Sequence, residues 1–110
     1  MNFNSEIVYY PNFVDYRNSI FYDISVFLSK SNGGVIFVDL DKKMHFNGEY
    51  FQILQFHSDW QLEIENWLNS QKLASCTINN VSFKSFLHYF EIEILPNEKE
   101  FIFENYIVQI

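Results

Sequence analysis

The run from Gly34 to Asp41 is the stretch that most limits how this chain can fold. It is the most apolar segment of the sequence, opened by a glycine pair and closed by two aspartates. In an extended conformation successive side chains point to opposite faces, so Val35 and Phe37 lie on one face and Ile36 and Val38 on the other. Strands that are apolar on both faces are typical of a sheet interior. We therefore predict a central strand here, covered on both sides.

Two amphipathic helices are predicted around this strand. The first begins at Asn12, an N-cap residue type, and ends near Ser31, where glycines follow. The second begins at the capping box of residues 58–61 and ends near Ser70. Apolar residues recur at helical spacing in both: Phe13, Tyr16, Ile20, Ile24, Phe27 and Leu28 in the first, and Trp60, Ile64, Trp67 and Leu68 in the second.

The segments Met44–Phe56 and Leu73–Phe90 fit strands or helices, and the sequence leaves this choice open. Asn47-Gly48 is a hairpin signal, which favours a strand on each side of it, the second running to Phe56. Asn79-Asn80 suits the start of a third short helix, with phenylalanines along one side. Residues 6–10 fit either a short strand or an extended arm.

The C-terminal segment has the pattern of a β-hairpin. Residues 91–95 and 100–104 both alternate between polar and apolar side chains, and four turn-forming residues separate them. Ile92 and Ile94 then belong to the core face. The other face combines glutamates and aliphatic residues without a lysine, and its members are Glu91, Glu93, Leu95, Glu100, Ile102 and Glu104.

This second face of the hairpin is our first candidate for a partner-binding surface. Like charges opposed across strands are destabilising, so a face of this composition is not expected from stability alone. An apolar centre with an acidic rim is typical of an interface for a basic partner. An ordinary solvated face is the alternative interpretation. Second candidates are the acids of the second helix, Asp59, Glu63 and Glu65.

Together these elements predict an α+β fold. We expect one domain over residues 1–110, with a mainly antiparallel sheet of about 4–6 strands packed with two or three helices. The 13 Phe, 7 Tyr and 2 Trp exceed what a small core readily hides. Some aromatic rings are therefore expected at the surface, where Tyr and Trp favour interfaces.

The sequence offers one motif with a catalytic counterpart. Asp39-Leu40-Asp41 after an apolar strand resembles the D-x-D of haloacid-dehalogenase phosphatases, where one carboxylate is a nucleophile and magnesium assists. Those folds need a much longer chain, and aspartate is also a common turn residue at a strand end. The three histidines lack the spacing of a helical metal pair, and one cysteine allows no internal disulfide. We predict no catalytic residue, metal site or cofactor.

Charge limits the classes of partner. The formal net charge is −7, and the only adjacent basic pair is Lys42-Lys43, so direct binding to nucleic acid is not expected. A basic protein is compatible. The start of the chain has no basic and apolar leader, and no stretch approaches the roughly 18 apolar residues of a membrane span. We expect a cytoplasmic protein without a membrane segment.

In size, acidity, aromatic content and lack of a catalytic motif, the chain resembles small bacterial immunity proteins. These proteins neutralise polymorphic or contact-dependent-inhibition toxins, which are commonly basic nucleases. The resemblance implies a non-catalytic inhibitor that binds a cognate toxin domain, and it transfers no residue roles. The alternatives are a phage-encoded inhibitor, such as an anti-CRISPR or nucleic-acid mimic, and a small metal-dependent enzyme using Asp39 and Asp41. Monomer and homodimer both remain open.

Overall fold

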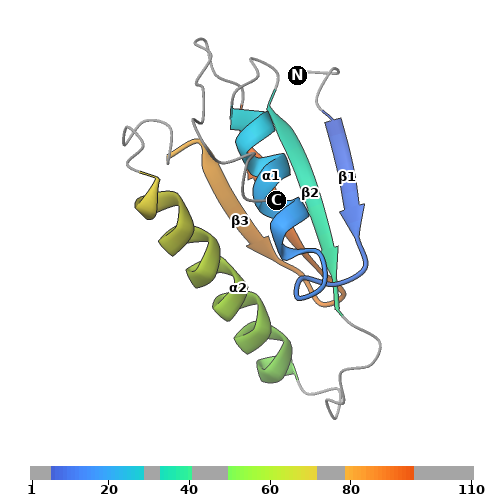
Figure 1. The fold of residues 1–110 in the computed structure, drawn as a ribbon. Coiled ribbons are helices and arrows are strands. Elements are labelled where there is room, and N and C mark those ends of the chain that lie inside the picture. Colours follow the sequence, from blue (N-terminus) through green and yellow to red (C-terminus); the bar gives the residue numbers. More distant parts are fainter. Residues whose placement is uncertain (1–5, 29–32, 41–49, 72–78, 96–110) are drawn as a thin grey trace.

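A mixed sheet with helices on one side forms the scaffold of the protein (Figure 1). The computed structural model describes residues 6–28, 33–40, 50–71 and 79–95. In these ranges the strands are β1 (Glu6–Tyr10), β2 (Gly34–Asp39), β3 (Val81–Ser85) and β4 (Tyr89–Ile94), and the helices are α1 (Arg17–Leu28) and α2 (Tyr50–Ser70). The strand order is β1-β2-β4-β3, with β1 parallel to β2 and the other pairings antiparallel. The predicted α+β class with a mainly antiparallel sheet is confirmed.

The strand β2 is central, as predicted, because it pairs with β1 on one edge and β4 on the other. Ile36 and Val38 are fully buried under the helices, while Val35 and Phe37 are half-buried on the opposite face. Cover on both faces was expected, and the described elements do not provide it. Both α1 and α2 pack on the face of Ile36 and Val38.

The core is the layer between the helices and this face of the sheet. The apolar stripes predicted for the two helices supply most of it, since Ile20, Ile24, Phe27, Leu28, Trp60, Ile64 and Leu68 are all buried. The sheet contributes Ile36, Val38, Phe90, Ile92 and Ile94. Aromatic rings join the two helices, because Phe21 stacks on Trp67 with ring centroids 4.7 Å apart.

The helix α1 begins at Arg17, later than the predicted start at Asn12. The Asn12 side chain caps a turn rather than a helix, because its Oδ1 accepts a hydrogen bond from the Asp15 backbone N–H at 2.8 Å. Side chains of this type offer the backbone such a local alternative to helix. Phe13 is nevertheless buried, and its ring stacks on Trp60 with centroids 5.4 Å apart. Phe13 was therefore correctly predicted to be a core residue, although it lies before α1 and not in it.

The helix α2 spans Tyr50–Ser70, so the predicted strand ending at Phe56 is wrong, and so is the helix start at Ser58. The S-x-x-Q pattern lies inside the helix. Buried Ile53 and His57 continue the stripe of Trp60 at steps of four and three residues, which is the spacing of one helical face. The predicted end near Ser70 is confirmed, and Asn47-Gly48 lies outside the described residues.

The predicted third helix after Asn80 is wrong, because β3 and β4 form a hairpin there. Phe83 faces the core and stacks on Phe90 with centroids 5.7 Å apart, while Lys84 points to the other face. Residues 6–10 form a strand, β1, rather than an extended arm. The predicted alternation of β4 is also confirmed, with Ile92 and Ile94 buried.

Both edges of β4 are occupied, one by β2 and one by β3. The predicted hairpin between this strand and residues 100–104 is therefore wrong, since β4 has no free edge for it. Residues 100–104 and 72–78 lie outside the described ranges. Neither α1 nor α2 is long and apolar enough to cross a membrane.

Candidate functional site

The sheet face that points away from α1 and α2 is the candidate site. Strand alternation and register bring ten side chains to it, and we call this set the open face: Ile7, Tyr9, Val35, Phe37, Asp39, Ser82, Lys84, Tyr89, Glu91 and Glu93. No described helix covers these residues. Ile7 is 71% exposed and Tyr9 is 59% exposed, so apolar and aromatic surface reaches solvent at the β1 end.

Cross-strand register places aromatic rings beside carboxylates on the open face. Phe37 lies between Tyr9 on β1 and Glu91 on β4, and Asp39 lies opposite Tyr89. Directly opposed residues on neighbouring strands are close enough for their side chains to interact. The open face therefore brings together the rings of Tyr9, Phe37 and Tyr89, with the carboxylates of Asp39 and Glu91 beside them.

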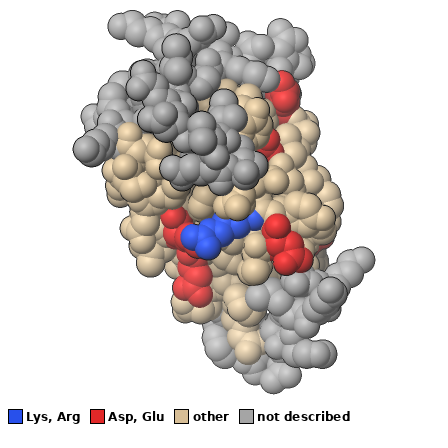
Figure 2. Space-filling view, in the orientation of Figure 1, with Lys and Arg blue, Asp and Glu red and all other residues tan. Residues whose placement is uncertain are grey.

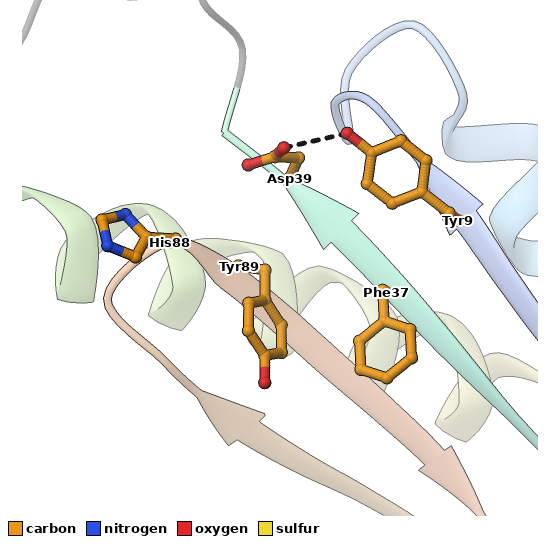
Figure 3. A pocket seen from close by; sticks show the side chains of 5 residues that line it. All are labelled: Tyr9, Phe37, Asp39, His88 and Tyr89. Atoms are coloured by element: carbon orange, nitrogen blue, oxygen red, sulfur yellow. Dashed lines mark hydrogen bonds between the residues drawn. The ribbon is translucent and has the colours of Figure 1, made fainter.

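A pocket of about 390 Å³ lies at one end of the open face (Figure 3). Its lining comes from three adjacent strands and the β3–β4 turn, and consists of Tyr9, Phe37, Asp39, His88 and Tyr89. The rings of Phe37 and Tyr89 meet edge to face, with centroids 5.4 Å apart and planes at 76°. Figure 3 shows these two rings in front of the sheet, with helices behind it.

The carboxylate of Asp39 is held in place at the edge of this pocket. Its Oδ2 accepts a hydrogen bond from the Tyr9 hydroxyl at 2.8 Å, and its Oδ1 accepts one from the Leu40 backbone N–H at 2.8 Å. The hydrogen bond to Asp39 is the main reason that the pKa of Tyr9 is raised. The phenol thus stays protonated at neutral pH and continues to donate.

The structure describes three of the six residues predicted for the hairpin face, and these three lie close together. Glu91 and Glu93 lie half-buried on the open face, and Leu95 is 44% exposed just beyond β4. The expectation of a face without lysine is wrong, because the Lys84 Nζ lies 3.8 Å from a Glu91 carboxylate oxygen. Glu100, Ile102 and Glu104 lie outside the described residues.

The acids of α2 belong to a different surface. Glu63 pairs with Arg17 of α1 at 2.5 Å, Asp59 accepts a hydrogen bond from Gln55 at 2.9 Å, and Glu65 is exposed. The helix α2 packs on the opposite face of the sheet from Glu91 and Glu93. The predicted acids of the hairpin and the predicted acids of α2 therefore do not form one site. Figure 2 shows a basic patch flanked by acidic ones on the side of the molecule seen in Figure 1.

Of the residues considered for catalysis, the structure describes Asp39 and its contacts. One oxygen of Asp39 is engaged by a phenol and the other by the backbone, and Asp41 lies outside the described ranges. Within those ranges, no group of three His, Cys, Asp or Glu residues is placed to hold a metal ion. Cys76 and His45 also fall outside them.

His57 of α2 is a core residue. It is 1% exposed and lies between the rings of Trp60 and Phe90, with Nδ1 2.5 Å from the Ser85 Oγ. Its Nε2 has no hydrogen-bond partner among the described residues. Burial lowers the pKa of His57 to about 4, so the imidazole is neutral at physiological pH.

Sequence reasoning missed the aromatic members of the site. Tyr9, Phe37 and Tyr89 come from three separate segments, and only the register of β1, β2 and β4 makes them neighbours. The alternation of the central strand placed Phe37 on the opposite face from Ile36 and Val38, although both faces were predicted to be covered. That alternation was the one available signal.

Comparison with known proteins gives no relative for this chain. No protein-family model matches it, and neither the characterised proteins nor the solved structures include one with significant similarity.

Proposed function

We propose that the chain is a non-catalytic binding protein that captures a basic protein on its open face. The observation that carries this proposal is the uncovered aromatic centre of Tyr9, Phe37 and Tyr89 with Asp39 and Glu91 beside it. Aromatic residues with polar groups around them are typical of interface cores. A partner with Lys or Arg around an apolar patch complements such a surface.

Charge supports a basic partner over nucleic acid. The described residues contain nine Asp and Glu but only two basic side chains, Arg17 and Lys84. Arg17 is paired with Glu63, and Lys84 lies beside Glu91. Phosphate groups would meet net negative charge, whereas a basic protein is attracted and its association is accelerated.

In biological terms, we propose an immunity protein that occludes a basic toxin in the bacterial cytoplasm. Its resemblance in size and acidity to such proteins is the basis for this class, and its single cysteine suits a reducing compartment. Carboxylates of the open face would pair with toxin Lys or Arg residues that otherwise hold a nucleic-acid phosphate. Inhibition then needs no chemistry from this chain.

The test uses the protein encoded next to this chain in its native gene cluster. Expressed alone it should arrest growth, and co-expression with this chain should restore growth. The purified pair should form a complex by calorimetry, with an affinity that falls as salt is raised. A harmless neighbour, or a toxic one that this chain does not bind, would count against the immunity role.

Charge reversal then locates the binding surface. Glu93→Lys changes a half-buried carboxylate of the open face, and we expect it to weaken the complex by about tenfold or more. The matched control is Glu65→Lys, an equal charge change on exposed α2 surface. Circular dichroism should show both variants folded. Loss of binding in the Glu65 variant alone would place the interface on the helix side.

A further inference from the structure

The walls of the pocket on the open face are aromatic and come from three neighbouring strands. Tyr9 lies on β1, Phe37 on β2 and Tyr89 on β4. Because the planes of Phe37 and Tyr89 are at 76°, their rings form a corner rather than a flat wall (Figure 3). The faces of aromatic rings carry partial negative charge and attract cations that lie over them.

The Tyr89 ring packs against Phe86, which lies in the turn between β3 and β4. Phe86 stacks on it with centroids 4.7 Å apart, and the Phe86 backbone N–H donates to the Tyr89 carbonyl at 3.0 Å. These contacts hold one wall of the corner in position without a ligand. A pocket whose walls are already ordered loses little conformational entropy on binding.

A carboxylate completes the pocket, and it retains acceptor capacity. Each oxygen of Asp39 receives one hydrogen bond, from the Tyr9 hydroxyl or the Leu40 N–H. A carboxylate oxygen has two lone pairs, so each oxygen is able to accept one more hydrogen bond. Two parallel N–H groups, as in a guanidinium, match this arrangement.

The described part of the chain supplies no cation for Asp39. Its two basic side chains, Arg17 and Lys84, lie beside Glu63 and Glu91. The only partners of the Asp39 carboxylate in those ranges are the neutral donors of Tyr9 and Leu40. Among the described residues, this negative charge beside three aromatic rings therefore has no cationic partner.

A guanidinium fits this combination better than other groups. It is planar, it stacks on aromatic faces, it is more weakly hydrated than an ammonium, and it pairs with a carboxylate through two N–H groups. An anion would be repelled by Asp39. A neutral apolar group would fill the aromatic corner but bury the carboxylate without a counter-charge, which is unfavourable.

We propose that the pocket of Tyr9, Phe37, Asp39, His88 and Tyr89 binds one arginine side chain, with the guanidinium over the rings and paired with Asp39. That this arginine belongs to a protein partner rests on the proposed function. The pocket's preference for a guanidinium rests on its own residues. This arginine would be the central anchor of the complex, since buried Arg contacts dominate many interfaces.

The direct test is a titration of the isolated protein, followed by NMR, with N-acetyl-arginine methylamide. Its matched control ligand is N-acetyl-citrulline methylamide, which has nearly the same shape but no charge. We expect saturable shifts confined to the pocket residues, with the arginine compound binding at least about tenfold tighter. Equal binding of the two, or no saturable shift, would overturn the proposal.

Variants then assign the roles. Asp39→Asn should remove about tenfold or more of the affinity for the arginine compound, and Phe37→Leu should also weaken it. Tyr9→Phe keeps the ring but loses the hydroxyl that holds Asp39, so a smaller loss is expected. Glu65→Gln removes an equal charge from α2 and should change nothing. Full affinity in folded Asp39→Asn would refute the assignment.

The two proposals fail in different ways. If the arginine compound binds but Glu93→Lys leaves the partner complex unaffected, the pocket stands and the proposed interface does not. If the partner binds through the open face and Asp39→Asn leaves that affinity unchanged, the interface stands and the arginine anchor is refuted.

Discussion

At the scale of single residues, Gly34 of β2 lies directly against the Phe27 ring of α1. A Cβ atom at this position would lie 2.6–2.8 Å from three atoms of the Phe27 ring, which is too short for any real contact. Phe27 is 1% exposed, so its ring is enclosed by the core and has little room to move. The glycine at this position is required by space and not by backbone conformation.

Gly34→Ala should therefore destabilise the protein by overpacking, by about 1–3 kcal/mol in urea denaturation. The control is the same change in a Phe27→Leu background. There the added methyl group meets a smaller side chain, so its cost should shrink and the two changes should be non-additive. Additive free energies would contradict the contact between these residues.

His57 makes stability depend on pH. Its pKa is lowered by burial to about 4 in the folded protein, against an ordinary value near 6.5 in the unfolded chain. Between these values the unfolded state binds more protons, so stability is fully present above pH 6.5 and falls as the pH is lowered. The loss should reach about 2 kcal/mol at pH 5 and about 3 kcal/mol below pH 4.

The measurement is the free energy of unfolding from pH 7.5 to 5 for wild type and His57→Gln. The variant is of lower stability throughout, but its curve should be flatter by about 2 kcal/mol over this range. All other side chains are the same in the two proteins, so their contributions cancel in the comparison. Parallel curves would show that His57 is not the group responsible.

At the scale of elements, two different contacts join α1 to α2. Phe21 stacks on Trp67 with planes only 1° apart, and Arg17 pairs with Glu63 at 2.5 Å. The ion pair is substantially exposed, with side chains 52% and 35% accessible, so water screens it. Phe21 is buried and its contact is not sensitive to salt.

Double-mutant cycles should rank these contacts. The coupling of Phe21 and Trp67, measured with leucine substitutions, should be about 1 kcal/mol and the same in 0.1 and 1 M salt. The coupling of Arg17 and Glu63, measured with alanine, should be below about 1 kcal/mol and should decrease in high salt. An ion-pair coupling that exceeds the aromatic one would reverse this ranking.

Elements marked by one uninterrupted period were predictable. The stripe from Ile20 to Leu28 and the alternation of β2 and β4 each follow a single spacing, and each is confirmed. The wrong predictions arose where a short capping or turn pattern competed with the periodic spacing of apolar residues. The capping pattern at Ser58 hid the earlier helical turns, and Asn79-Asn80 suggested a helix where a hairpin forms.

The candidate site was less accessible to prediction than the fold. The inward and outward faces of β4 follow from alternation, so Glu91 and Glu93 were placed on the correct side of the strand. Which strand lies next to β4 depends on the whole topology, and local patterns do not encode it. For that reason we predicted that β4 pairs with residues 100–104. We did not predict that Tyr9 and Phe37 lie near β4.

At the scale of the whole molecule, negative charge is spread over both layers. On the open face it is combined with the exposed ring of Tyr9 and the half-buried rings of Phe37 and Tyr89. The described residues carry nine carboxylates and two bases, which equals the full net charge of −7. Long-range attraction of a basic partner therefore acts from many directions. For the proposed basic partner, short-range contacts would decide the bound position, and the pocket of Tyr9, Phe37 and Tyr89 is where we propose that they form.

The strand order also determines when the pocket forms during synthesis of the chain. The β2–β4 ladder joins Asp39 to Tyr89 and Gly34 to Ile94, so the centre of the sheet closes over a long stretch of chain. Contacts of such sequence separation form late and slow the folding of a domain. A nascent chain that ends before Tyr89 lacks β4, and with it the Tyr89 wall of the pocket. The pocket is therefore complete only after residues 89–94 have been added to the sheet.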